Sequence, residues 1–161
     1  MSCFAGKVAI VTGSSNGIGQ TTTVLLAFQG AAVTIHGRLL EGEIKDNQIV
    51  LDLIEKTVER FGKLNILVNN ARVGRKTGVE YTSLKNYEFI RDVNIKSIIK
   101  LNDLAEPHLE KIKGNIVNVS SISAIVYVSL FFRNGANFIH STNSPSLLRC
   151  VQGCFGSLHV D

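Results

Sequence analysis

A glycine-rich turn near the start of the chain limits its possible folds more than any other feature. The apolar run 8–11 predicts a short, buried parallel strand, and Thr12 leads from it into the turn. A helix is predicted over 20–29, and it stops at Gly30. The glycines of the turn are Gly13, Gly17 and Gly19. A strand, a glycine turn and a helix in this order place a phosphate at a helix N-terminus, where free N–H groups and the helix dipole face the anion. The flanking elements therefore favour a nucleotide site over a loop that binds nothing.

The charge pattern argues against a nucleic-acid-binding protein. The 161 residues carry a net charge of +4, with a pI of about 9.1. Lysines and arginines between residues 56 and 113 alternate with acidic residues, as they do on solvated helix faces, and form no basic stripe. This balance weakly favours small anionic ligands, and nucleic acid is not an expected partner.

The sequence carries no recognisable targeting or membrane signal. Residues 1–7 lead straight into the first strand, with no cationic segment followed by an apolar one. The uncharged stretch 115–132 contains several asparagines and serines, so a membrane-spanning helix is not expected there. Cys3, Cys150 and Cys154 make no disulfide framework. We therefore expect a cytoplasmic protein that is not bound to a membrane.

Strands and helices alternate along the chain. After the first strand and helix, further strands are predicted at 31–36, 64–68 and 115–120. Helices are predicted at 46–61 and at 83–113, and Pro107 is able to interrupt the second. This alternation predicts an α/β fold, in which a parallel sheet is joined by right-handed crossovers.

One connection is too short for a complete sheet of this kind. Only seven residues lie between Arg38 and Asp46, where a helix and another strand are expected. The last segment, 124–161, is poor in charge and shows no clear periodicity. We therefore predict a dinucleotide-binding domain over 1–123, with a shortened crossover near 39–45, and a divergent tail over 124–161.

Four motifs, met in order along the chain, resemble the short-chain dehydrogenase/reductase family. They are Thr12-Gly13-x-x-x-Gly17-x-Gly19, Asn69-Asn70-Ala71, Asn94 within Val-Asn-Ile-Lys, and the run from Gly114 to Ser121. The resemblance covers about residues 5–123. It implies an incomplete Rossmann-like, doubly wound parallel sheet. It also implies an oxidoreductase that transfers hydride between a nicotinamide cofactor and a carbonyl/alcohol pair.

The resemblance also implies which residues bind the cofactor. They are Gly13, Ser14, Ser15, Gly17, Ile18, Gly19, Arg38, Asn69 and Ala71. Asn69 and Ala71 would lie beside the adenosine ribose, while the Asn69–Asn70 turn braces the central strands. Arg38 ends the second strand, where an acidic residue would hold the ribose 2′-hydroxyl of NAD. An arginine suits a 2′-phosphate instead, through charge-assisted bidentate hydrogen bonds, so NADP is expected in preference to NAD. Arg72 departs from the family pattern, which has a glycine at that position.

Only part of the family's catalytic set has a counterpart here. Ser121 resembles the serine that hydrogen-bonds the substrate, and Asn94 resembles the residue that holds a water in the proton relay. The family's acid–base tyrosine, followed four residues later by a lysine, has no counterpart after Ser121, because Lys113 is the last lysine. A general acid contributes about 100- to 10,000-fold in rate. We therefore expect weak or absent activity of this chain on a small carbonyl or alcohol substrate.

Two other functions stay open. The first is a non-catalytic nucleotide-binding or interaction protein derived from the same family. The second is a zinc site in the tail, although its candidate ligands fit no standard spacing. Those ligands are His140, Cys150, Cys154 and His159. Because one sheet face has few predicted helices to cover it, we also expect exposed apolar surface, and with it oligomerisation, a partner or poor solubility. The family resemblance implies that a homo-oligomer forms through the 83–113 helix, because the family uses the long helix before the serine strand in a subunit interface.

Overall fold

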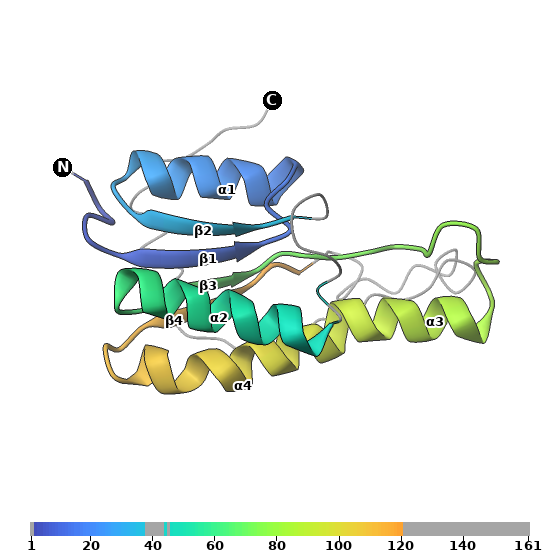
Figure 1. Cartoon of the computed structure of the whole chain (residues 1–161). Helices are drawn as coiled ribbons and strands as arrows, with labels where there is room; N and C mark the ends of the chain where they lie inside the picture. The colour runs from blue at the N-terminus through green and yellow to red at the C-terminus, as the bar shows by residue number, and fades with distance from the viewer. Residues whose placement is uncertain (1, 38–43, 45, 121–161) are drawn as a thin grey trace, which may run out of the picture.

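The computed structural model describes residues 2–37, 44 and 46–120, and in this part of the chain strands and helices alternate (Figure 1). The strands are β1 (Val8–Thr12), β2 (Ala32–His36), β3 (Ile66–Asn69) and β4 (Asn115–Asn118). The helices are α1 (Gly17–Phe28), α2 (Asn47–Phe61), α3 (Leu84–Arg91), a π-helical turn η1 (Asp92–Lys96) and α4 (Ser97–Glu110). The predicted order of elements is confirmed, with ends that move by a few residues.

The four strands form one parallel sheet in the order β2-β1-β3-β4. The first strand of the chain is therefore central, and Ala9 lies opposite Val33 on one side and Ile66 on the other. On the far side of β3, Val68 lies opposite Val117 of β4. This arrangement confirms the predicted α/β fold with a parallel sheet.

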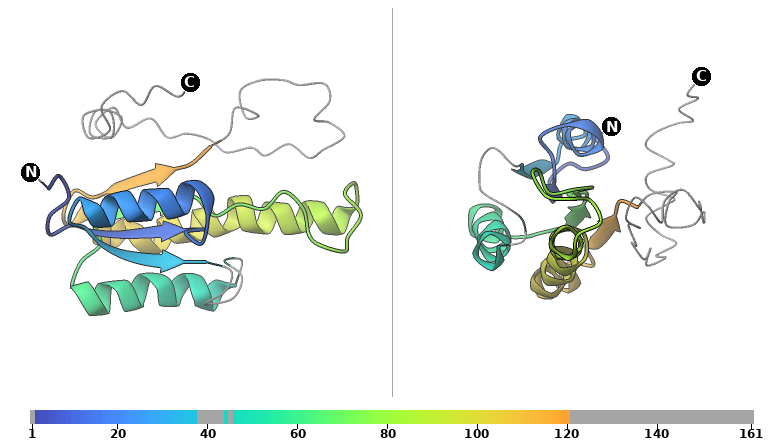
Figure 2. Two further views of the ribbon diagram at one scale, coloured as in Figure 1. Left: turned by 90° about the horizontal axis from the view of Figure 1, so that it is seen from above. Right: turned by 90° about the vertical axis from the view of Figure 1, so that its right-hand side faces the viewer.

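Helices cover both faces of the sheet, so the sheet is doubly wound (Figures 1 and 2). Helices α2 and α4 lie over one face, and α1 lies over β1 and β2 on the other face. Because side chains alternate along a strand, Ile10 and Leu67 join the core under α2 and α4, whereas Val11 and Val68 join the core under α1. No helix of the described residues is long and apolar enough to span a membrane.

Helix α2 shows why the predicted boundaries hold where strong end signals exist. The Asp46 carboxylate accepts a hydrogen bond from the Gln48 N–H at 2.9 Å and caps the N-terminus. Gly62 ends the helix in a left-handed conformation, at φ 73°, and its N–H donates to the carbonyl of Val58. Between these ends, Val50, Leu53 and other apolar residues point into the core.

The predicted 83–113 helix differs from the observed one in two respects. Pro107 does not interrupt it, because α4 continues to Glu110. The irregularity lies earlier, at the π-helical turn η1, where the backbone takes one extra residue per turn and the buried Asn94 is located. The Ser97 hydroxyl donates to the carbonyl of Val93 at this turn.

Strand β2 lies at one edge of the sheet that the described residues form. Among the described residues, β2 pairs with β1 alone. Residues 38–43 and 45 lie outside the described part of the chain, as does the whole predicted tail over 124–161.

Candidate functional site

The N-terminus of α1 lies at the carboxyl end of β1, directly after the glycine turn. The helix begins at Gly17, three residues earlier than the predicted start at Gln20. Its N-cap residue, Asn16, makes no capping hydrogen bond through its side chain, and the first turn contains no acidic residue. The first backbone N–H groups of α1 and the positive end of its dipole therefore face the turn without a competing carboxylate.

Two glycines of the turn are required by close packing. A Cβ on Gly19 would lie 2.3 Å from the carbonyl oxygen of Gly13, and one on Gly13 would lie 2.7 Å from the Cα of Ala71. Gly13 and Gly17 also have positive φ, at 65° and 55°. A Cβ on Gly17 would meet nothing within 4 Å, so this position borders open space. Ser15 and Ile18, which flank it, are exposed.

Thr12 and Asn70 join the glycine turn to the end of β3. The Thr12 hydroxyl oxygen accepts hydrogen bonds from the N–H groups of Asn70 and Ala71, both at 3.0 Å. In return, the Asn70 amide donates to the carbonyls of Thr12 and Gly13, at 3.0 and 3.1 Å. The predicted bracing by the Asn69–Asn70 turn is confirmed. The part played by Thr12 was not predicted, although a hydroxyl residue just before the first glycine was a usable signal.

Ser14 ties the turn to β2. Its N–H and its hydroxyl both contact the carbonyl of His36, at 2.9 and 3.1 Å, and its hydroxyl oxygen accepts from the His36 N–H at 2.9 Å. Ser14 itself is buried. In this structure its donors hold the loop in place, and a direct contact with a phosphate stays a prediction.

Asn69 points away from the turn, into the layer between the sheet and α4. Its amide nitrogen donates to the side-chain oxygens of Asn102 on α4 and Asn118 on β4, at 2.9 and 2.8 Å. Only 2% of Asn69 is exposed, whereas Ala71 is half-buried at the turn. Because the side chain of Asn69 is buried and engaged in these bonds, only the backbone groups of Asn69 are available for the predicted contact with a ribose.

Asn94 fixes the segment that follows the Asn69–Asn70 turn. Its side-chain oxygen accepts from the N–H of Val73 and its amide donates to the carbonyl of Val73, both at 2.9 Å. Asn86 holds the same connection further along, because it accepts from the Lys76 N–H and donates to the Tyr81 carbonyl, both at 2.8 Å. Both asparagines are buried. The role of Asn86 was missed, since nothing in the local pattern separates it from a surface asparagine.

Several predicted site residues lie outside the described part of the chain. These are Arg38, Ser121 and the four candidate zinc ligands of the tail. Within the described residues, no group of three or more histidine, cysteine, aspartate or glutamate side chains is placed to hold a metal. Arg72, which stands in place of the family's glycine, is exposed.

One tyrosine in the described part has a lysine four residues after it, but not on a shared helical turn. Tyr81 precedes Ser83, the N-cap of α3, and Lys85 is near the start of that helix. The two side chains are therefore not stacked as i and i+4 on one helix face. This spacing does not supply the family's tyrosine–lysine pair.

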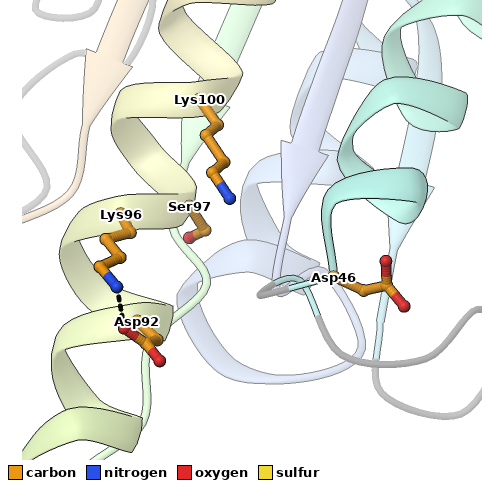
Figure 3. Close-up of a pocket in the computed structure, with 5 residues that line it drawn as sticks. All are labelled: Asp46, Asp92, Lys96, Ser97 and Lys100. Atoms are coloured by element: carbon orange, nitrogen blue, oxygen red, sulfur yellow. Dashed lines mark ion pairs between the residues drawn. The ribbon is translucent and has the colours of Figure 1, made fainter.

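A hollow lies between the N-terminus of α2 and helix α4, apart from the glycine turn described above (Figure 3). Its volume is about 400 Å³, and it is lined by Asp46, Asp92, Lys96, Ser97 and Lys100. The Lys96 ammonium lies 2.9 Å from the Asp92 carboxylate, and this hydrogen bond lowers the pKa of Asp92. The Lys100 ammonium hydrogen-bonds to the side chain of Asn47. Among the described residues that line this hollow, none is a predicted cofactor residue.

Comparison with known proteins agrees with this geometry. The family model of the short chain dehydrogenases matches residues 38–133, which is more than half of the sequence. The chain belongs to the short-chain dehydrogenase family of oxidoreductases. Among curated proteins it is 29% identical to a 3-oxoacyl-[acyl-carrier-protein] reductase of Thermotoga maritima, over 74% of this chain and 57% of the relative. It is 34% identical to the L-fucose dehydrogenase of Bos taurus, over 74% of this chain and 50% of the relative.

Solved structures of the family share the fold. A short-chain dehydrogenase/reductase of Caenorhabditis elegans, solved with its cofactor, has a TM-score of 0.70 at 34% identity, over 76% of this chain and 55% of that one. The apo glucose dehydrogenase of the same organism has a TM-score of 0.72 at 36% identity, over 81% and 61%. The chain thus spans about half the length of the curated relatives it matches.

Proposed function

We propose that the glycine turn binds the pyrophosphate of NADP(H), and that the chain derives from an oxidoreductase acting on a small carbonyl/alcohol pair in the cytoplasm. The uncapped N-terminus of α1, placed against a turn with room for a phosphate at Gly17, carries this proposal. The relatives include a reductase and sugar dehydrogenases, and one structure of the family holds a cofactor. The domain over 1–123 is the part to which the proposal applies.

Each residue of the turn has a distinct task in this proposal. Gly13 and Gly19 keep β1, α1 and β3 close enough for the turn to stay tight, while Gly17 leaves space for the phosphate. Ser15 and Ile18 offer backbone N–H groups at the exposed rim. Thr12 and Asn70 hold the turn in its binding conformation before the ligand arrives. A nicotinamide cofactor bound here supplies or accepts the hydride.

A pair of glycine variants tests the binding site. Gly19→Ala introduces a methyl group that collides with backbone, so NADPH affinity should fall about tenfold or more. Gly62→Ala is the control, because Gly62 has a positive φ, at 73°, but lies at the end of α2, where a Cβ would meet nothing within 4 Å. Gly62→Ala should lose about 1 kcal/mol of stability and bind normally. Nicotinamide fluorescence measures binding, and circular dichroism checks folding. Unchanged binding by a folded Gly19→Ala variant would contradict the proposal.

A separate titration decides between the two cofactors. We propose that Arg38 holds the 2′-phosphate, so the chain should bind NADPH more tightly than NADH. Arg38→Asp should lower NADPH affinity about tenfold to a hundredfold and raise that for NADH. Equal affinities for both cofactors in the unaltered chain would refute NADP preference while leaving the turn's role intact.

We propose further that turnover by the 161-residue chain is weak, with Ser121 and Asn94 as the residues retained from the catalytic set. No tyrosine after Ser121 is followed by a lysine at the family spacing, and that observation also favours the second candidate, a nucleotide-binding protein without catalysis. Stopped-flow absorbance with NADPH and small aldehydes or ketones separates the two. Tight binding without oxidation of NADPH supports the second candidate, and turnover at ordinary enzyme rates of about 1–1,000 per second contradicts weak activity.

A further inference from the structure

The strand order brings two loops together at one point of the sheet. Strand β1 leads into α1 on one face, whereas its neighbour β3 leads through α3 and η1 to α4 on the opposite face (Figure 1). The connections after these two strands therefore leave in opposite directions. Such a reversal is a topological switch point, and in open α/β sheets ligands bind there, outside the carboxyl ends of the strands. The glycine turn follows β1 at this point, and the segment after β3 faces it.

The segment after β3 is packed directly against the glycine turn. A Cβ on Gly13 would lie 2.7 Å from the Cα of Ala71, and one on Gly19 would lie 2.4 Å from the amide nitrogen of Asn70. Asn70 and Ala71 are half-buried by these contacts, and the next residue, Arg72, is exposed. Arg72 is therefore the first exposed side chain after β3, one residue beyond the contact with the turn.

The backbone of Arg72 is held on both sides. Before it, the Ala71 N–H donates to the Thr12 hydroxyl at 3.0 Å. After it, the N–H and C=O of Val73 both bond to the Asn94 side chain at 2.9 Å. Arg72 has no positive φ, so the backbone at this position does not require the family's glycine. The arginine therefore extends from a fixed point beside the turn without backbone strain.

The two loops at the switch point are free of acidic residues. Neither residues 1–40 nor residues 60–79 contain an aspartate or glutamate. Within the described residues, no carboxylate forms an ion pair with Arg72. An arginine stays charged at neutral pH, and its planar fork of N–H donors matches the oxygens of a phosphate. Its charge adds to that of the uncapped N-terminus of α1, so both favour an anion at the same place.

We propose that Arg72 is a further cofactor-binding residue, whose guanidinium hydrogen-bonds to the pyrophosphate held at the glycine turn. This role rests on the proposed function and adds to it a side chain that the family pattern does not contain. The pyrophosphate is common to NADP(H) and NAD(H), so Arg72 strengthens the binding of both to the same extent. The 2′-phosphate, which we assign to Arg38, takes no part in this contact.

Substitutions of two arginines in the full chain test this contact. Arg72→Ala should weaken the binding of NADPH and of NADH about tenfold each, because both lose a charge-assisted hydrogen bond. Arg72→Lys keeps the charge without the planar fork and should lose about threefold. The matched control is Arg75→Ala, which removes another exposed arginine of the same segment. Arg75 lies beyond Val73, where the chain runs along α3 and away from the sheet (Figures 1 and 2), so both affinities should stay within about twofold.

Nicotinamide fluorescence measures both affinities, and circular dichroism establishes that each variant is folded. Unchanged or tighter binding by Arg72→Ala, equal losses from Arg72→Ala and Arg75→Ala, or a loss for NADPH alone would each overturn the role of Arg72. The Gly19→Ala variant separates this role from the proposed function. If Gly19→Ala weakens binding and Arg72→Ala does not, the role of Arg72 alone fails. If the unaltered chain binds neither cofactor, or Gly19→Ala binds as tightly as it does, the proposed function fails, and the role of Arg72 fails with it.

Discussion

The two faces of the sheet differ in what they contribute. Within the described residues, the face under α2 and α4 holds the larger core, with eleven buried residues in one cluster, and α2 is capped at both ends. The cluster under α1 holds five buried residues of the same part of the chain, and its helix begins without a side-chain cap. The uncapped helix is the one directed at the proposed phosphate. Stability is thus concentrated on one face, and the capacity to bind an anion is on the other.

Core truncation should separate the two faces most strongly. Leu101→Ala on α4 removes a side chain that is 1% exposed in the larger core, and it should cost about 3–5 kcal/mol of unfolding free energy. Leu26→Ala on α1, which is 8% exposed in the smaller core, should cost about 2–3 kcal/mol. Urea unfolding followed by circular dichroism measures both. Equal losses of unfolding free energy would mean that the two cores do not differ in what they contribute to stability.

Asn69 and Asn70, which are neighbours in one turn, should show the same division between stability and ligand binding. Asn69→Leu deletes the amide that joins Asn102 and Asn118, leaves their half-buried side-chain oxygens without this donor, and should cost about 1–3 kcal/mol. Asn70→Ala removes the brace on the glycine turn, and it should lower NADPH affinity more than stability. Chemical unfolding and NADPH titration of both variants give the comparison. A larger stability loss from Asn70→Ala than from Asn69→Leu would reverse the assignment.

Helix caps provide a smaller contrast. Asp46→Ala removes the cap of α2 and should cost about 1 kcal/mol. Asn16→Ala should cost almost nothing, because the Asn16 side chain makes no capping hydrogen bond in α1. Thermal unfolding of the two variants at the same pH tests this. A loss on Asn16→Ala as large as that on Asp46→Ala would show that α1 is capped in solution.

The smallest effect should be a dependence on acid pH. Hydrogen bonds from Lys56 and Lys96 lower the pKa values of Asp52 and Asp92 below the ordinary 3.8. A carboxyl whose pKa is lowered by folding stabilises the folded state above its ordinary pKa, and this contribution is lost as the pH falls through the lowered value. Asp52→Asn and Asp92→Asn should therefore flatten the loss of stability below about pH 4. Unchanged pH profiles would show that both pairs are fully screened by solvent.

The sequence predicted those elements that have strong local signals. The 46–61 helix was placed within one residue because Asp46 and Gly62 are unambiguous end signals. The start of α1 was placed late, because Gly17 and Gly19 are poor helix formers, yet here the first turn of the helix is built from them. The bracing by Asn70 followed from the family resemblance, whereas the contacts of Asn69 with α4 and β4 depend on packing over long sequence distances.

The irregularity in the predicted 83–113 helix shows why other features of the fold could not be predicted from the sequence. Pro107 gave a strong breaking signal, but it lies near the exposed end of α4, where one missing backbone hydrogen bond is tolerated. The π-helical turn has no local signature in Asp-Val-Asn-Ile-Lys. It coincides with the hydrogen bonds between Asn94 and Val73, which only the folded chain brings together.

The strand order has a consequence for how the chain forms during synthesis. Because β1 is central, Ala9 cannot meet Ile66 until the ribosome has made everything between them. The β1–α1–β2 unit can assemble first, and its exposed β1 edge then waits for β3 and β4 to dock in turn. Such late, non-local pairing slows folding and leaves an apolar strand edge open to other chains. Nascent-chain proteolysis at increasing lengths should accordingly show protection rising in two steps, with the second after residue 69 emerges.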